Sequence, residues 1–250
     1  MTKRAALVTG ASYGVGAATA VSLADDGFDV VVSATGLENL ESIRTRLESM
    51  GARAVPVVLD LRSQSSIEHA MTEAISAFGH LDVLVNNAGA NLSKQAAEVT
   101  SAEWDVVIGT NLTGTFFMTQ QFGRHLIDNG RPGCIVNIAS IHGLIGVAGR
   151  STYGISKAAI IHMTRMLAIE WADYGIRVNA IAPGRMDTSS PSRRSTAADP
   201  SYITAMLDRI PLHRLATAEE VAASTCYLVS PQAASITGQT LILDGGLTVV

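Results

Sequence analysis

The chain has 250 residues, of which 47% are hydrophobic and 16% are charged, and its formal net charge is −4. This composition is typical of a globular protein and excludes a disordered or collagen-like chain. A single α/β domain commonly reaches this length, so we expect one domain over residues 1–250. Since no run of like charges is present, we expect neither nucleic acid nor a membrane surface as a partner.

The cysteines and the N-terminus point to a reducing compartment. Cys134 and Cys226 lie far apart in apolar stretches, which predicts reduced core residues rather than a disulfide or metal framework. The N-terminus lacks the pattern of a signal peptide, and no apolar run approaches the roughly 20 residues that span a bilayer. We therefore expect a soluble cytoplasmic protein without a metal site.

Short runs rich in β-branched residues recur along the chain. They are almost wholly apolar, which is typical of parallel strands buried on both faces. Segments with helical periodicity, such as 37–50 and 65–78, lie between them. This alternation predicts a single Rossmann-type α/β fold, a doubly wound sheet of seven mainly parallel strands with helices on both faces. The expected strands are 5–8, 29–32, 54–58, 81–85, 134–138, 177–181 and 240–243.

A glycine-rich turn follows the first expected strand and opens a helix. Gly10, Gly14 and Gly16 allow the backbone to approach a pyrophosphate closely, and a helix N-terminus offers free N–H groups to phosphate. Their spacing departs from the common Gly-x-Gly-x2-Gly fingerprint. The turn indicates a dinucleotide site, with a plain strand-to-helix turn as the alternative.

Tyr153 and Lys157 lie one helical turn apart in an expected helix over 151–174, so their side chains share a face. An ammonium beside a phenol favours the phenolate, which makes the pair a candidate acid/base. Tyr-x3-Lys alone is more often two exposed helix residues. Ser140 supports the functional interpretation, because it follows a central strand at the sheet edge where open parallel sheets bind ligands.

Two further features concern the surface. The stretch 185–214 is too long for an ordinary connection, and we interpret it as a substrate lid, with an idle surface loop as the alternative. The segments 104–126 and 151–174 carry more apolar residues than one buried face needs, which indicates subunit packing.

Together these motifs closely resemble the classical short-chain dehydrogenase/reductase family over essentially the whole chain. The resemblance implies the Rossmann-type fold, a bound NAD or NADP, a small-molecule substrate and a homotetramer. The matching residues are Thr9-Gly10-x3-Gly14-x-Gly16, Asp60-Leu61, Asn86-Asn87-Ala88-Gly89, Asn111, Ser140, Tyr153-x3-Lys157, Pro183-Gly184 and Asp244-Gly245-Gly246.

The resemblance also implies a catalytic tetrad that interconverts a secondary alcohol and a ketone. Tyr153 would exchange the hydroxyl proton while hydride passes between the substrate carbon and the nicotinamide. Lys157 would favour the tyrosinate and hold the nicotinamide ribose. Ser140 would hydrogen-bond the reacting oxygen, and Asn111 would position a water in the proton relay.

The implied cofactor contacts lie at the edge of the sheet where Ser140 is expected. Asp60 and Asn87 have an alternative interpretation as structural hydrogen-bonding residues. The implied contacts are Gly10, Ser12, Tyr13, Gly14, Val15 and Gly16 in the glycine turn; Asp60 and Leu61 near adenine; Asn87, Ala88 and Gly89 along its ribose; and Pro183, Gly184 and Met186 at the nicotinamide, beside Tyr153 and Lys157.

The end of the second strand bears on the choice between NAD and NADP. Neither the acidic residue typical of NAD enzymes nor the basic residue typical of NADP enzymes is present there. Ser33 and Thr35 can hydrogen-bond a 2′-phosphate, and no carboxylate would repel it. We therefore expect a slight preference for NADP.

Asn91, His142 and Arg150 suggest a substrate. With Ser140, their pattern resembles 3-hydroxybutyrate dehydrogenases, in which His, Lys and Gln grip the substrate carboxylate, and Arg150 and Asn91 would replace the Lys and Gln. Arginine can hold a carboxylate bidentately, so a small hydroxy acid is one candidate substrate. The alternative is that Arg150 and His142 are structural.

Other activities stay open. The Ser33-Ala34-Thr35 strand ending resembles 3-oxoacyl carrier-protein reductases, which favour a basic patch for the acidic carrier. Sugar, polyol and cyclic-alcohol dehydrogenases are further alternatives. A non-catalytic cofactor sensor is a different class, and the complete tetrad argues against it. The candidate patch residues are Arg124, Arg185, Arg193 and Arg194.

Overall fold

The computed structural model describes residues 3–186 and 207–250. Its centre is a seven-stranded sheet of order β3-β2-β1-β4-β5-β6-β7, and every neighbouring pair is parallel. The expected sheet is confirmed, because each predicted strand overlaps an observed one. The strands are β1 (Ala5–Val8), β2 (Asp29–Ala34), β3 (Ala54–Val58), β4 (Val83–Asn86), β5 (Gly133–Ile138), β6 (Ile176–Pro183) and β7 (Thr240–Leu243).

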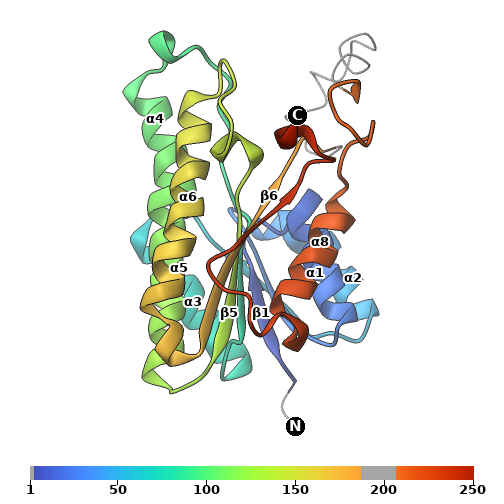
Figure 1. Ribbon diagram of the computed structural model, residues 1–250. Coiled ribbons are helices and arrows are strands. Elements are labelled where there is room, and N and C mark those ends of the chain that lie inside the picture. The colour runs from blue at the N-terminus through green and yellow to red at the C-terminus, as the bar shows by residue number, and fades with distance from the viewer. Residues whose placement is uncertain (1–2, 187–206) are drawn as a thin grey trace.

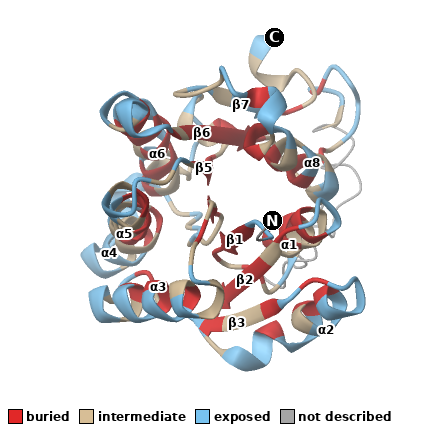
Figure 2. Cartoon of the chain, turned by 90° about the horizontal axis from the view of Figure 1, so that it is seen from below, coloured by how far each residue is buried: buried red, intermediate tan, exposed pale blue. Residues whose placement is uncertain are grey.

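Helices cover both faces of this sheet, so the doubly wound arrangement is confirmed (Figures 1 and 2). Successive strand residues point to opposite faces. Leu7 and Val31 accordingly join the core under α3 (Gln64–Phe78), α5 (Thr115–Asp128) and α6 (Ser151–Glu170). Val8 and Val30 join the core under α1 (Gly14–Asp25), α2 (Glu41–Ser49) and α8 (Ala218–Val229).

The expected amphipathic segment 104–126 is not one continuous helix. It divides into α4 (Ser101–Ile108), a π-helix (Gly109–Gly114) and α5. At the end of the π-helix the backbone closely approaches the loop after β3, since a Cβ atom on Gly114 would overlap the carbonyl oxygen of Leu61. The wider π turn accommodates this contact and displaces the helix that follows.

A buried polar network ties the middle of the sheet to two helices. The Asn86 amide donates to Thr119 Oγ1 and to Asn137 Oδ1, each at 2.8 Å. Asn137 in turn donates to Thr164 Oγ1 at 2.9 Å. Strands β4 and β5 are therefore fixed to α5 and α6 directly below the edge where the strands end.

Three further expectations concern the cysteines, membrane spans and the lid. Cys134 and Cys226 are free, and burial raises the pKa of the first thiol to about 11 and of the second to about 12. Within 3–186 and 207–250, not one helix combines the length and apolar character that a bilayer crossing needs. Most of the expected lid, residues 187–206 with Arg193 and Arg194, lies outside the described residues.

The amino edge of the sheet carries a charged cluster. The Asp82 carboxylate accepts the Ala5 N–H at 2.8 Å and the Arg131 guanidinium at 3.1 Å. His125 on α5 accepts the Leu81 N–H through Nε2 at 3.4 Å, which requires that nitrogen to be unprotonated. Burial, and secondly the charge of Arg131, lower the pKa of His125.

This lowered pKa predicts a loss of stability in mild acid. Below the unfolded-state pKa of about 6.5, the unfolded chain binds more protons than the folded chain. The free energy of unfolding should therefore fall with pH below that value, with at most about 1.4 kcal/mol per pH unit from this group. Urea unfolding between pH 7 and 5 measures the slope. His125→Gln should flatten it, exposed His69→Gln should not, and an unchanged slope in His125→Gln contradicts the prediction.

Candidate active site

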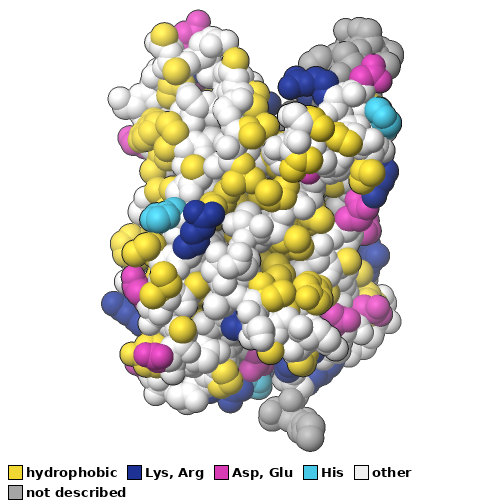
Figure 3. Space-filling model, viewed as in Figure 1, with side chains coloured by type: hydrophobic (Ala, Val, Ile, Leu, Met, Phe, Trp, Pro, Cys, Tyr) yellow, Lys and Arg dark blue, Asp and Glu magenta, His cyan; other side chains and the backbone are white. Residues whose placement is uncertain are grey.

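The expected tetrad lies at the carboxyl edge of the sheet, the upper edge in Figure 1. Ser140 follows β5, Tyr153 and Lys157 lie in the first turns of α6, and Asn111 lies in the π-helix. A Cβ atom on Gly89 would be 3.2 Å from Asn111 Oδ1 and 3.7 Å from Lys157 Nζ. The chain thus brings these residues, distant in sequence, to the same edge of the sheet. Seen from the same side, the upper edge of the molecule is notched (Figure 3).

Lys157 is buried beneath the tyrosine. Its Nζ donates to the Ile138 carbonyl at the end of β5, at 2.7 Å, and lies 5.7 Å from the centroid of the Tyr153 ring. The loop from β5 to α6 packs tightly on this helix turn, since a Cβ on Gly143 would be 2.7 Å from the Lys157 carbonyl carbon. The ammonium is thereby held between the strand end and the phenol.

The side-chain amide of Asn111 hydrogen-bonds to other residues of the protein. Its Oδ1 accepts the Ala90 N–H at 2.7 Å, and its Nδ2 donates to the Ala90 carbonyl and to Ser156 Oγ, each at 2.9 Å. The side chain is 1% exposed. It therefore fixes the π-helix against both α6 and the loop after β4.

Ser140 and His142 lie beside the tyrosine. Ser140 Oγ accepts the His142 N–H at 3.2 Å. The His142 ring meets the Tyr153 ring edge-on, with centroids 5.9 Å apart and planes at 87°. The structure therefore brings Ser140, His142 and Tyr153 together, as the sequence predicts.

Arg150 and Asn91 also meet. Arg150 Nη1 donates to Asn91 Oδ1 at 2.8 Å, and nearby the Lys94 N–H donates to the Gly149 carbonyl at 2.9 Å. These bonds join the loop after β4 to the loop before α6. Arg150 is half-buried, and no carboxylate of the described residues lies within ion-pair distance of it.

The glycine turn fits a dinucleotide phosphate. Gly10 and Gly14 have φ of +64° and +58°, which favour glycine, and a Cβ on Gly10 would be 2.8 Å from Ala88 Cα. Helix α1 begins at Gly14 without a side-chain cap at Tyr13 and without an acidic residue in its first turn. Its terminal N–H groups can therefore receive an anion. Ser12 is half-buried in the turn, whereas Val15 is packed into the core under α1.

The residues expected near the adenosine have structural partners. Asn87 Nδ2 donates to the carbonyls of Thr9 and Gly10 at 3.0 and 2.8 Å, so its side chain holds the glycine turn. Asp60 accepts the Arg62 N–H at 2.9 Å and its guanidinium at 3.3 Å. The backbone bond, more than the guanidinium, lowers the pKa of Asp60. Leu61 is buried beside it.

At the end of β2, only one of the two residues expected to contact a 2′-phosphate is accessible. Ser33 is fully buried, so its hydroxyl does not reach a 2′-phosphate, and Thr35 is the exposed member of the pair. Glu38 folds its carboxylate back over Gly36, where it takes the space a Cβ would need. A carboxylate is thus present beside this loop although none ends the strand.

The nicotinamide end of the expected site follows β6. Gly184 donates its N–H to the Leu243 carbonyl at 2.8 Å, and a Cβ on it would be 2.9 Å from Asp244 Cα. Met186 forms a parallel bridge with Ala216. Pro183, Gly184 and Met186 are therefore anchored to the C-terminal segment.

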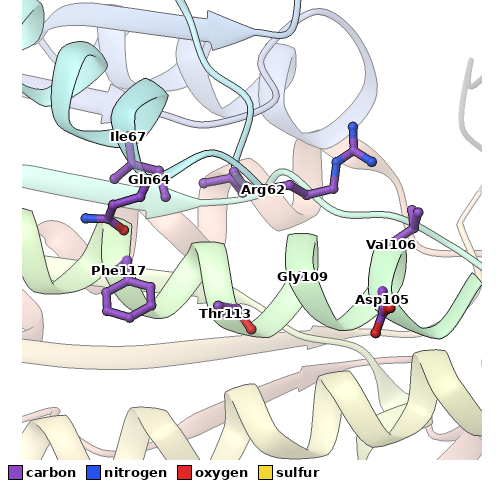
Figure 4. A pocket seen from close by; sticks show the side chains of 9 residues that line it. Arg62, Gln64, Ile67, Asp105, Val106, Gly109, Thr113 and Phe117 are labelled. Atoms are coloured by element: carbon purple, nitrogen blue, oxygen red, sulfur yellow. The ribbon is translucent and has the colours of Figure 1, made fainter. Parts of the chain in front are cut away.

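Two cavities lie away from the tetrad. One of about 380 Å³ is walled by Gln64 and Ile67 of α3 and by Thr113 and Phe117 opposite (Figure 4). It adjoins the same π-helix that carries Asn111. The other, of about 790 Å³, lies between α5 and α6.

Sequence reasoning missed Ala90 and Ser156, the partners of Asn111. Ala90 acts through its main chain, which leaves no signature in sequence. Ser156 directly precedes Lys157 on the same turn, but a serine within a helix commonly bonds only its own backbone.

Known proteins match nearly the whole chain. A family model described as enoyl-(acyl carrier protein) reductase matches residues 10–248. A 3-oxoacyl-(acyl-carrier-protein) reductase of Thermotoga maritima is 36% identical over 243 residues, 97% of each chain.

Two solved structures superpose over nearly the whole chain. A short-chain alcohol dehydrogenase from Sinorhizobium meliloti has a TM-score of 0.95 and 38% identity, and the match covers 100% of this chain and 98% of that one. A 2-deoxy-D-gluconate 3-dehydrogenase from Agrobacterium tumefaciens with bound NADP has a TM-score of 0.90 and 35% identity, covering 99% and 97%. The chain therefore belongs to the classical short-chain dehydrogenase/reductase family of NAD(P)-dependent oxidoreductases.

Proposed function

We propose that the protein interconverts a secondary alcohol and a ketone at Tyr153. The observation that carries this proposal is the buried Lys157 ammonium, which is fixed to the Ile138 carbonyl and faces the Tyr153 ring. A fixed cation stabilises the phenolate that proton abstraction from an alcohol requires. Ser140 lies nearby, since its Oγ accepts the main-chain N–H of His142, whose ring contacts the Tyr153 ring.

In the oxidation direction, the Tyr153 phenolate takes the hydroxyl proton of the alcohol. The Ser140 hydroxyl donates a hydrogen bond to the same oxygen and holds the carbon in line. Pro183, Gly184 and Met186 would border the nicotinamide of a bound NAD(P), which would supply the hydride acceptor for this oxidation. Both N–H groups of the Asn111 amide already have acceptors, so this amide would not donate to a water of the proton relay.

The glycine turn, with Gly10 and Gly14, would hold the cofactor phosphates. We propose a preference for NADP, supported by the exposed Thr35 and by the NADP-bound relative from Agrobacterium tumefaciens. The carboxylate of Glu38 over Gly36 should limit this preference to a few-fold.

For the substrate, we propose a hydroxy acid whose carboxylate binds Arg150. A half-buried guanidinium without a carboxylate partner among the described residues leaves a charge to be met by a ligand. Asn91 holds one side of the guanidinium, so the remaining donors keep a fixed direction. The relative from Agrobacterium tumefaciens is named for 2-deoxy-D-gluconate, which is a hydroxy acid.

A carrier-linked 3-oxoacyl thioester is the second candidate, favoured by the relative from Thermotoga maritima. Of the arginines expected to receive the carrier, Arg124 lines the groove between α5 and α6, away from the tetrad. A sugar or polyol without a carboxylate is a third.

We also propose a homotetramer that works in the cytoplasm, where free thiols persist. A tetramer with three two-fold axes needs at least two separate self-complementary surfaces. One is the groove between α5 and α6, where Phe116 and Met166 are exposed. The other is the free edge of β7, where Leu241 and Ile242 are exposed and apolar side chains gather (Figure 3).

Tyr153→Phe should lower kcat by roughly 10²- to 10⁴-fold, because it removes the acid/base. The variant should still bind NADPH, a few-fold more tightly than NADH, when both are titrated by fluorescence. Tyr227→Phe, an exposed tyrosine of α8, is the control and should keep full activity. Full turnover in Tyr153→Phe would refute the catalytic assignment, and equal affinities would refute the NADP preference.

Arg150→Gln should raise KM for short hydroxy acids about 10- to 100-fold, the scale of a lost charge-assisted hydrogen bond. Activity with neutral alcohols should change less than about two-fold. Initial rates measured at 340 nm with both substrate classes test this, with exposed Arg165→Gln on α6 as the control. Turnover confined to thioesters or neutral alcohols, and unaffected in Arg150→Gln, would make Arg150 structural.

Light scattering should give a mass four times that of the chain. Met166→Arg should reduce the assembly, because it places a charge in the groove between α5 and α6. Leu37→Arg, at another exposed apolar residue, should leave it intact. A monomer in the unaltered protein would contradict the proposal.

A further inference from the structure

Ser156 hydrogen-bonds to two parts of the candidate active site, the π-helix and the first turn of α6. Its hydroxyl accepts a hydrogen bond from Asn111 Nδ2 at 2.9 Å and donates one to the Tyr153 carbonyl at 2.7 Å. The residue is fully buried and directly precedes Lys157. One hydroxyl therefore connects the π-helix to the helix turn that carries the acid/base pair.

The Asn111 amide, which Ser156 holds, lies close to the Lys157 ammonium. Asn111 Oδ1 and Lys157 Nζ both lie against Gly89, at 3.2 and 3.7 Å from the position of a Cβ atom there. A shift of the Asn111 amide would therefore change the surroundings of the ammonium. Without Ser156, one Nδ2 hydrogen of a side chain that is 1% exposed would lose its partner, and the amide would move or admit water.

We propose that Ser156 is a positioning residue for the reaction: it sets the orientation of Asn111 and, through it, the environment of Lys157 and Tyr153. The proposal rests on the function proposed above. Ser156 itself touches neither Tyr153 Oη nor Lys157 Nζ in these contacts, so it acts through its neighbours.

The chain supplies a matched control in the same helix. Thr164 lies on α6, is also fully buried, donates to the Ile160 carbonyl and accepts a bond from a buried asparagine, Asn137, at 2.9 Å. Its bonding repeats that of Ser156 farther from the tetrad. Thr164→Val therefore removes the same kind of buried bond without touching Asn111.

The test compares Ser156→Ala, Ser156→Cys and Thr164→Val. A cysteine side chain has about the size of serine but forms only weak hydrogen bonds. Ser156→Cys therefore tests the proposal if Ser156→Ala does not fold. Alcohol oxidation should show kcat reduced about 10- to 100-fold for the Ser156 variants. The pH at half-maximal kcat should rise by about half a unit or more, because a displaced ammonium stabilises the phenolate less. The cofactor Kd should change less than about three-fold.

Thr164→Val should lower Tm as much as Ser156→Ala but leave kcat and its pH profile unchanged. Equal kinetics in all three variants and the unaltered protein would overturn the proposal, as would equal losses in Thr164→Val and Ser156→Ala. Tyr153→Phe separates this failure from failure of the proposed function. If that variant is inactive while the Ser156 variants have normal pH profiles, Tyr153 keeps its role and Ser156 is only structural.

Discussion

The buried ammonium of Lys157 is the constraint on which the site depends. Removing an ammonium from water is costly unless hydrogen bonds replace those of the solvent, and here the carbonyl at the end of β5 provides one. This bond exists only because parallel β5 ends directly below the first turns of α6. Gly89 then leaves room beside the cation, and Gly143 allows the loop after β5 to pack on the main chain of Lys157. Sheet topology, helix start and loop composition thus all serve to hold one charge beneath one phenol.

The loop after β4 and the loop before α6, which border the proposed substrate side, are joined to each other. Arg150 and Asn91 join them, and Lys94 reaches from the first loop to Glu103 at the start of α4. That ion pair, together with the N-cap bonds of Thr100, lowers the pKa of Glu103 to about 2. The carboxylate stays ionised through neutral and mildly acidic pH, so the attachment of the loop persists across this range. One wall of the substrate side is therefore pre-organised before any ligand arrives.

Much of the fold could be predicted because a buried parallel strand leaves a strong local signal. The apolar runs predicted every strand, and the spacing of Tyr153 and Lys157, taken together with Ser140 and the family resemblance, predicted the proposed acid/base pair. The remaining features depend on contacts between distant residues. Arg150 and Asn91 are 59 positions apart, and nothing local indicates that they bond. The burial of Ser33 depends on which face it takes at the end of its strand, and the close approach of the backbone at Gly114 depends on Leu61.

The π-helix has a consequence for helical phase. An α-helix advances about 100° per residue, so a residue added within one turn rotates everything after it relative to everything before it. A π turn holds more residues than an α turn, so the segment Gly109–Gly114 accommodates an added residue while α4 and α5 keep the faces that they bury. Loss of one residue from the segment Gly109–Gly114 would restore a continuous α-helix with α4 and α5 facing as before, and Asn111 would lose the wider turn on which it lies. The angular position of Asn111 is thus encoded by residue count as much as by residue identity.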